Sequence, residues 1–483
     1  MIKAFWVPSG PYRHKLSIFH GYFHHKRIFI PVIHRHISRH MRYKVKASAN
    51  VSVPLSGETV WLGMRRKHMS WIKHARNAAP ALTILTCLAA LPAGEILAPR
   101  AAMAQDAAAT PEQTIRIVYL ELDETHRWPS TWLDQPPADE GVEGARLALR
   151  DNATTGRFLN QNYVLDEQIH PTAEAVVQAF KDRLKAGDRS FVLSVPPDLL
   201  LHLADLPEAK DALLIDAKLP DDRLRGADCR HNVLHTMPSR AMLADALMQY
   251  LTVKNWHHVM LVNGKTPDDA LYAEAMRRSA KKFQIRIVAD RPWTFNPATQ
   301  QADTGHFQIN TEVSRLTQDV DYDVLIVADE AGNFGDSLSY RTNTPRPVAG
   351  TQGMVPEAWA RPFDEYASTQ FQSRFLKLAH RWMTSLDYGA WMAVRSFGEA
   401  ATRTGQSDPT KLAAYIRGDS FALAAYKGPP LNFRPWDGQL RQPVLLADDR
   451  SLISISPQPG FLHQFYETDT LGIDRPESTC HMQ

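Results

Sequence analysis

The chain has 483 residues and a formal net charge of +3, a length that exceeds one ordinary hydrophobic core and suits two lobes with additional segments. The charge is divided unevenly: residues 1–104 carry 16 basic and 2 acidic side chains, and the rest of the chain carries 39 basic and 50 acidic ones. The body is therefore acidic, which argues against a nucleic-acid partner, because such a partner requires a basic footprint.

Residues 64–104 have the plan of a secretory signal peptide. A basic stretch begins at Met64-Arg65-Arg66-Lys67, and an apolar stretch covers 78–93. Ala102-Met103-Ala104 forms a cleavage site that would leave Gln105 as the first mature residue. The apolar stretch is too short to span a membrane readily. We therefore interpret it as a cleaved signal peptide and expect export to the periplasm.

Residues 1–63 have a different composition, with seven histidines and one acidic residue. This composition fits no packed domain. We expect the segment to be disordered, or to be a mis-assigned upstream extension with Met64 as the true start. A metal-binding role of the histidines is the less favoured alternative.

After residue 104, short apolar runs alternate with helical patterns, which is typical of parallel, doubly wound sheets. A first set of strands is expected at 115–120, 163–168, 190–195 and 213–217. A second set is expected at 259–262, 285–289, 322–328 and 348–350. Later helices are expected at 365–378, 386–404 and 408–417, followed by a β-rich tail with a hairpin turn at Asp437-Gly438.

The segment 232–264 connects the two sets of strands. Pro238 disfavours a helical residue before it, and Ser239 is a suitable helix N-cap. The helix that begins at Arg240 has apolar residues at helical spacing, namely Leu243, Leu247, Tyr250 and Leu251. We interpret this segment as a crossover between two lobes.

The crossover resembles a known family. HTMPSRAMLADALMQYL followed by VMLVNG is similar to the lobe-crossing segment of type I periplasmic binding proteins of the leucine/isoleucine/valine-binding kind. A narrower resemblance, to the substrate-binding component of an ABC importer found alongside pyrroloquinoline quinone-dependent alcohol dehydrogenase systems, is carried by blocks such as YLELD, DYDVLIVADE, SYRTNTPRPVAGTQG and FRPWDGQLRQP.

The resemblance covers 112–460 and implies an α/β fold of two doubly wound, Rossmann-like lobes with a hinge and an interlobe cleft. Lobe 1 would comprise 105–236 and 361–425, and lobe 2 would comprise 237–360 and 426–483. Small residues such as Gly144 and Ala148 resemble the family's first helix, and we interpret them as packing residues.

The sequence contains no G-x-S-x-G, P-loop, H-E-x-x-H or C-x-x-C motif, so we expect no enzyme, catalytic residue, metal site or cofactor. In doubly wound folds, ligands bind outside the carboxyl ends of the strands. By this rule and the resemblance, the expected ligand-binding residues are Trp128, Ser194, Asp216, Ala217, Asn263, Asp329, Glu330 and Gln352.

Two of these positions depart from the family's pattern. Gln352 stands where the resemblance implies an ammonium-binding Glu, and Asp216-Ala217-Lys218 replaces a run of small residues. Both departures argue against an amino-acid ligand. Trp128 could stack on a ligand or serve packing, and Asp329 and Glu330 could bind a cation or lie in solvent; these alternatives stay open.

The function that the resemblance implies is a monomeric periplasmic binding protein that captures a small molecule by hinge closure and delivers it to an ABC permease. A ligand-sensing module on the same fold is the alternative, and it would pass its signal to a receptor or regulator. An enzymatic function would need a nucleophile that the sequence does not reveal.

Two cysteines, Cys229 and Cys480, follow the predicted signal peptide. An oxidising compartment favours their pairing, which requires Cα atoms within ~7 Å of each other. A disulfide would hold the polar tail near the crossover and add about 5 kcal/mol at most. Two unpaired thiols remain the alternative.

The predicted signal peptide gives a testable expectation. The exported protein should begin at or near Gln105, because cleavage follows Ala104. N-terminal sequencing of the periplasmic fraction measures this directly. A full-length product found only in the cytoplasm would show that the signal is misassigned.

Overall fold

The computed structural model describes residues 18–23, 26–31, 112–124, 136–294 and 305–482. Within the predicted N-terminal extension, strands β1 (Ile18–Phe23) and β2 (Lys26–Pro31) pair antiparallel. The predicted signal peptide and the rest of residues 1–63 lie outside the described residues, and the expectations about them stay predictions.

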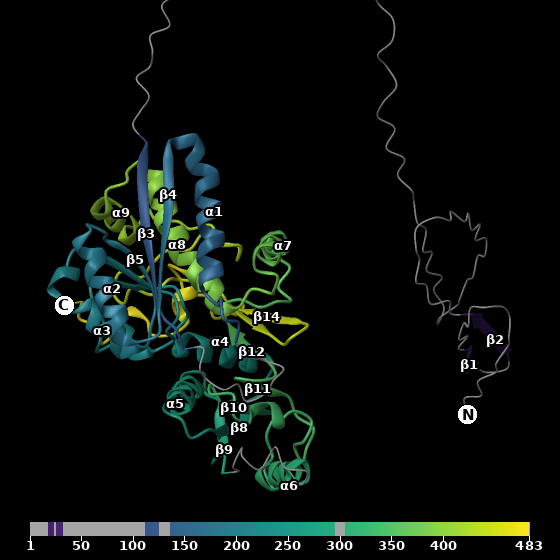
Figure 1. Ribbon diagram of the computed structural model, residues 1–483. Helices are drawn as coiled ribbons and strands as arrows, with labels where there is room; N and C mark the ends of the chain where they lie inside the picture. Colours follow the sequence, from purple (N-terminus) through teal and green to yellow (C-terminus); the bar gives the residue numbers. More distant parts are fainter. Residues whose placement is uncertain (1–17, 24–25, 32–111, 125–135, 295–304, 483) are drawn as a thin grey trace, which may run out of the picture. The chain divides into compact units, whose positions relative to one another are not determined.

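The first sheet is parallel and has the strand order β4-β3-β5-β6-β7. Figure 1 labels its strands β3, β4 and β5. Its strands are β3 (Gln113–Leu122), β4 (Gln161–His170), β5 (Ser190–Ser194), β6 (Leu213–Asp216) and β7 (Val233–His235). Helices α1 (Val142–Leu159), α2 (Ala173–Lys185) and α3 (Pro197–Ala204) lie between successive strands.

Helices cover both faces of this sheet. Side chains alternate along a strand, so Ile117 and Tyr119 of β3 pack into a core with α1 and α8 (Ser385–Thr404). Val118 and Leu120 pack into a second core with α2 and α3. We call this sheet and its helices the first lobe.

The second sheet is also parallel, with the order β11-β10-β8-β9. Its strands are β8 (His258–Asn263), β9 (Arg286–Pro292), β10 (Val324–Ala328) and β11 (Val348–Gly350). Helices α4 (Arg240–Val253) and α5 (Pro267–Lys282) share a core with one face, and α6 (Gly305–Thr317) packs on the other. We call this unit the second lobe.

A small antiparallel sheet links the two lobes. It has the order β12-β13-β14 and consists of β12 (Val355–Glu357), β13 (Val444–Ala447) and β14 (Leu452–Ser456). Alternate residues of β13 enter different cores: Val444 and Leu446 belong to the core of the second lobe, and Leu445 and Ala447 to that of the first. One strand therefore packs in both lobes.

The remaining helices are α7 (Ser368–Ala379) and α9 (Pro409–Arg417), next to α8 in sequence. None of the helices in the described part of the chain has the length and apolar character that a membrane span needs. The α/β class with parallel sheets, predicted from the alternation of apolar runs, is confirmed. The exact division of the chain between lobes stays a prediction.

The turn expected at Asp437-Gly438 is present, with short paired segments on either side. The Gly438 N–H donates to the Arg434 carbonyl oxygen at 3.1 Å, and the N–H groups of Arg434 and Arg441 donate across the turn to Gln439 and Asn432, both at 2.8 Å. The pairing is limited to an antiparallel bridge between Phe433 and Leu440. The same loop also bonds to the crossover segment, because His235 donates its backbone N–H to the Gly438 carbonyl oxygen and its carbonyl oxygen accepts from the Leu440 N–H, both at 2.9 Å.

The N-terminus of α8 is locked against α1 by a buried carboxylate. Asp387 is fully buried and accepts hydrogen bonds from the backbone N–H of Gly141 at 2.8 Å and from the Arg381 guanidinium at 2.6 and 3.0 Å. A Cβ at Gly144 would lie 1.9 Å from the Asp387 carbonyl oxygen. Close helix packing therefore explains why position 144 is glycine.

Replacement of Asp387 by alanine should destabilise the folded protein by about 3–5 kcal/mol, because it removes the buried carboxylate that accepts from Arg381 and from the backbone N–H groups of Gly141 and Thr384, and leaves Arg381 only its pair with Asp139. Urea unfolding measures this. The control is Asp182→Ala on α2, where the side chain is 56% exposed and little change is expected. A loss equal to that of the control would contradict the structural role of Asp387.

Candidate functional site

The carboxyl ends of three neighbouring strands form a polar edge on the first lobe. Glu121 of β3 and Ser194 of β5 are paired in register, and the Tyr119 hydroxyl donates a hydrogen bond to Glu121 at 2.6 Å. Burial raises the pKa of Glu121 to about 7, although the hydrogen bond from Tyr119 and the charge of Lys218 lower it. Lys218 follows β6 and pairs with Glu124. The edge thus combines hydroxyls, an ammonium group and a carboxyl group that titrates near neutral pH.

Asp216 lies beside this edge, at the end of β6, and is fully buried. Its carboxylate accepts hydrogen bonds from the backbone N–H of Lys218 at 3.0 Å and of Leu219 at 3.1 Å, and it lies 2.8 Å from Nδ1 of His235. Burial and the charge of Arg225 lower the pKa of His235 to about 4. At neutral pH the uncharged imidazole therefore donates from Nδ1–H, since a carboxylate only accepts. Asp216 fixes the turn after its own strand.

Asp329 has the corresponding place on the second lobe, directly after β10. It is 1% exposed, and its carboxylate accepts the backbone N–H groups of Asn333, Phe334 and Gly335 at 2.9, 2.7 and 2.6 Å. Gln352, after β11, reaches the same loop, because a Cβ at Gly335 would lie 2.0 Å from its Oε1 atom. Asp329 therefore fixes the conformation of the loop that Gln352 contacts.

Arg240 joins the two lobes at the first residue of α4 and is 3% exposed. Its guanidinium donates to Asp221, between β6 and β7 of the first lobe, at 3.1 Å. It also donates to Glu330, after β10 of the second lobe, at 2.6–3.1 Å, and to Asp268 of α5 at 3.3 Å. Burial raises the pKa of Glu330 despite the hydrogen bond from Arg240. One cation thus holds carboxylates of both lobes.

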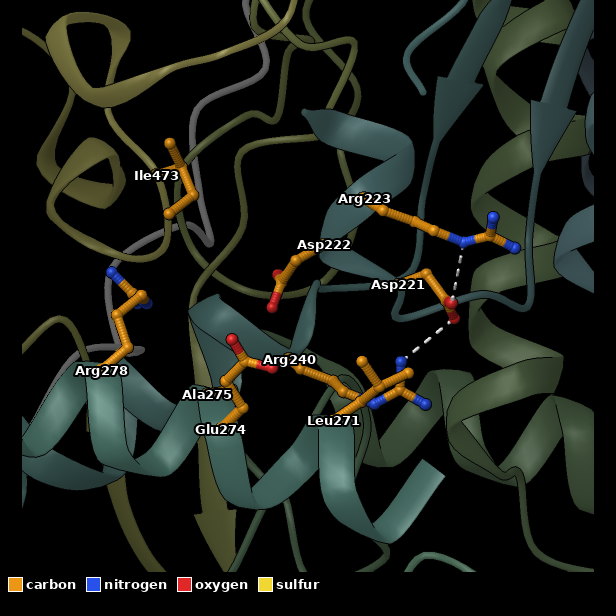
Figure 2. A pocket seen from close by; sticks show the side chains of 9 residues that line it. All are labelled: Asp221, Asp222, Arg223, Arg240, Leu271, Glu274, Ala275, Arg278 and Ile473. Carbon is orange, nitrogen blue, oxygen red and sulfur yellow. Dashed lines mark hydrogen bonds and ion pairs between the residues drawn. The ribbon is translucent and has the colours of Figure 1, made fainter. Parts of the chain in front are cut away.

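A pocket of about 350 Å³ opens beside Arg240. Figure 2 shows Asp221 between Arg223 and Arg240, with side chains of α5 along one side. The lining combines both signs of charge with an apolar strip: Asp221, Asp222, Arg223, Arg240, Glu274 and Arg278, with Leu271, Ala275 and Ile473. First-lobe and second-lobe residues face each other across it, so we call it the interlobe pocket.

The residues expected at the site fall into three groups. Trp128 lies outside the described residues. Asp216, Ala217 and Asp329 are buried in the fold, and the contacts that the structure shows for the two carboxylates are structural ones. The others are Ser194, which is 2% exposed at the first-lobe edge, Glu330 on Arg240, Gln352 on the Asp329 loop, and Asn263, whose amide donates to Asp290 at 2.9 Å. All of these assignments to a solute site stay predictions.

Sequence reasoning missed Arg240 and Asp221. Arg240 follows the N-cap Ser239 directly, and a charged residue at the start of a crossover helix was the available signal. Its partners are 19, 28 and 90 residues away, so no local pattern identifies them. In the part of the chain that the structure describes, no group of histidine, cysteine and acidic side chains could hold a metal ion.

His235 gives the stability of the protein a defined pH dependence. The unfolded histidine has a pKa near 6.5 and the folded one about 4, so below pH 6.5 the unfolded chain takes up a proton that the folded chain does not. Stability should fall as pH drops from 6.5 to 4 and level off below that, by roughly 3 kcal/mol in total.

Chemical unfolding between pH 4 and 7 measures this dependence. His235→Asn, which keeps a donor toward Asp216, should reduce the slope, whereas His380→Asn at an exposed site should keep it. Equal slopes for the wild type and His235→Asn would refute the assignment.

Comparison with known proteins supports the fold alone. No protein-family model and no curated protein matches the sequence. Solved structures do match. A branched-chain amino acid ABC transporter periplasmic ligand-binding protein from Burkholderia xenovorans is 15% identical with a TM-score of 0.58, and the match covers 76% of this chain and 99% of that one.

Two further structures agree. The leucine-, isoleucine-, valine-, threonine- and alanine-binding protein of Brucella ovis, in its closed conformation, is 15% identical with a TM-score of 0.57, covering 78% of this chain and all of the other. A periplasmic binding protein from Burkholderia mallei is 13% identical with a TM-score of 0.55, covering 77% and 99%. The chain therefore has the α/β fold of type I periplasmic binding proteins, and its neighbours are solute-binding proteins of the branched-chain amino acid type.

Proposed function

We propose that this protein binds a small solute between its two lobes in the periplasm and delivers it to an ABC permease. The observation that carries the proposal is the arrangement at Arg240, where acidic side chains from the carboxyl ends of both parallel sheets meet on one residue. Ligands of doubly wound folds bind outside these strand ends, and two such lobes close on them by hinge motion.

Binding rather than catalysis is supported by the neighbours, which are periplasmic binding and amino-acid-binding proteins. Export is supported by the predicted signal peptide. The sequence blocks quoted above support a finer proposal, that the transporter operates alongside a pyrroloquinoline quinone-dependent alcohol dehydrogenase system. We propose that the protein acts as a monomer and uses no cofactor.

The solute site that we propose uses polar side chains at the strand ends that are not bound by the backbone of the following loop. On the first lobe these are Glu121, Ser194 and Lys218, which form the polar edge. On the second lobe they are Asn263 and Gln352, at the ends of β8 and β11. Trp128 stays a proposed stacking residue.

Glu330 is also proposed for the solute site, but it is bound by Arg240. It can contact a solute only as part of that ion pair. Asp216, Ala217 and Asp329 support the walls, so their replacement should lower stability before it changes binding.

A thermal-shift screen tests the proposal with alcohols, carboxylic acids, amino acids and quinone-related compounds. A solute present at 100 times its dissociation constant should add about 2.7 kcal/mol to the free energy of unfolding. For the solute that binds, Ser194→Ala and Glu121→Gln should abolish most of the shift while the melting temperature without solute changes little.

The control variant is Asp182→Asn, exposed on α2, which should keep the full shift. Because the pKa of Glu121 is about 7, the affinity should also change between pH 6 and 8 in the wild type, whereas the residual affinity of Glu121→Gln should not. If the solute binds both variants normally, the site is elsewhere.

A further inference from the structure

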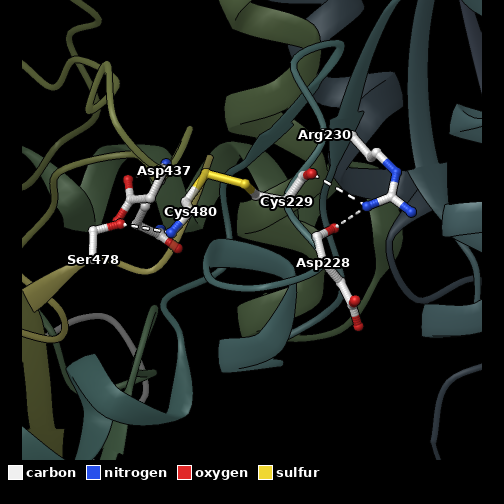
Figure 3. Close-up of a disulfide and its surroundings, with 7 residues drawn as sticks. Asp228, Cys229, Arg230, Asp437, Ser478 and Cys480 are labelled. Atoms are coloured by element: carbon white, nitrogen blue, oxygen red, sulfur yellow. Dashed lines mark hydrogen bonds between the residues drawn. A yellow bond between two sulfur atoms is a disulfide. The ribbon is translucent and has the colours of Figure 1, made fainter. Parts of the chain in front are cut away.

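The last residues of the chain run from the second lobe back to the first. Leu471 is fully buried in the core of the second lobe, together with residues of α4, α5 and β8. Nine residues later, Cys480 forms a disulfide with Cys229, which lies between β6 and β7 of the first lobe (Figure 3). The two Cα atoms are 5.7 Å apart. Of the two alternatives that the sequence left open, the structure has the bonded pair.

The second-lobe end of this segment is held by buried polar contacts. The backbone N–H of Gly472 donates to the carboxylate of Asp245, a fully buried residue of α4, at 2.9 Å. The Lys282 ammonium of α5 donates to the carbonyl oxygens of Thr470 and Gly472 at 3.2 and 3.1 Å, and to Asp245 at 2.9 Å. Residues 470–472 are therefore fixed to two helices of the second lobe.

Asp469, just before residues 470–472, is fixed to the part of the chain that leads into β13. Asp469 is 2% exposed and accepts hydrogen bonds from Arg434 at 2.9 Å and from Arg441 at 2.8 Å. Arg434 also donates to the carbonyl oxygen of Leu471 at 2.8 Å. These contacts fix the start of the segment independently of the disulfide.

Between its two fixed ends, the segment passes over the interlobe pocket. Ile473 lines this pocket with Asp222 and Arg223 of the first lobe and with Leu271 and Arg278 of α5. A wider separation of the lobes would have to carry Cys229 away from Leu471. The segment therefore experiences the same motion that opens the pocket.

We infer that residues 471–480, closed by the Cys229–Cys480 disulfide, form a strap that limits how far the lobes open and holds Ile473 at the interlobe pocket. Nine residues span at most roughly 30 Å when fully extended, and this segment is shorter because it contains the 3₁₀ turn Arg475–Glu477. Beyond this reach, opening must pull Leu471 out of its core. The inference rests on the proposed function in so far as that function requires the lobes to move.

Pulsed electron–electron double resonance on the full chain measures how far the lobes open. Spin labels attached to p-acetylphenylalanine at Glu174 of α2 and Arg315 of α6, both exposed, report the distance between lobes without adding a cysteine. The double variant Cys229→Ser with Cys480→Ser should shift the distance distribution to longer values and broaden it. Lys282→Met, which weakens the other end of the strap, should act in the same direction.

The matched control is Lys281→Met, because Lys281 is the adjacent lysine of α5 and is exposed; its distribution should superimpose on that of the wild type. Circular dichroism verifies that each variant is folded. If the double variant does not fold, a dithiol reductant added to the folded wild type cleaves the disulfide to two thiols and is itself oxidised to a disulfide, and the same shift is expected.

An unchanged distribution after loss of the disulfide overturns the strap. The measurement needs no solute, so it is separate from the solute screen. A protein that binds a solute but keeps its distance distribution without the disulfide would refute only the strap. A protein that binds none of the solutes but opens further would refute only the proposed function.

Discussion

The arrangement of the two lobes depends on one buried cation. A guanidinium removed from water is tolerated only when it is paired and hydrogen-bonded, and Arg240 satisfies this requirement with carboxylates from both lobes. Backbone bonds reinforce the junction, because the Arg240 N–H donates to the carbonyl oxygen of Pro220 at 2.8 Å and the Ala241 N–H to the Asp222 carboxylate at 3.0 Å. The start of α4 is therefore anchored on the first lobe, while the rest of the helix packs in the second.

A second polar network connects the chain segments that link the lobes. The buried Lys427 ammonium group donates to the Gln442 side chain and to the Pro443 carbonyl oxygen, both at 2.9 Å. The Gln442 amide in turn donates to the carbonyl oxygen of Thr236, in the crossover, at 2.6 Å. Burial lowers the pKa of Lys427 well below its usual range and raises that of Glu357, on β12, to about 8. Such a network is satisfied in few geometries, which favours one defined path for each linking segment.

The elements of the fold could be predicted from the sequence because buried parallel strands leave a local signal. The apolar run at 259–262 corresponds to β8 and the run at 190–195 to β5. The turn at Asp437-Gly438 also formed as predicted, but the sequence did not show that its residues bond to the backbone of His235 in the crossover as well. Local patterns do not contain contacts of this kind.

The candidate site could be predicted only in outline. The strand-end rule identified Asp216 and Asp329 as residues at the carboxyl edges of the sheets, where the structure places them. It could not show that each carboxylate is already bound by backbone N–H groups of the loop that follows. A carboxylate in a turn has the same sequence signature whether it faces a ligand or its own backbone. The contacts of Arg240 were beyond the sequence altogether, because they join residues up to 90 positions apart.

These internal contacts determine which groups remain for a solute. Asp216, Asp329 and Glu330 are already bound to their own backbone or to Arg240, so a solute that replaced those contacts would leave buried polar groups unpaired, at a cost of 1–3 kcal/mol for each group, roughly. Glu121 differs, because its contacts are a hydrogen bond from Tyr119 and the charge of Lys218, and burial raises its pKa to about 7. At neutral pH this carboxyl group is therefore about half protonated, so a solute can favour either protonation state at little cost. The first-lobe edge is therefore where a polar solute can add interactions without breaking those that hold the lobes together.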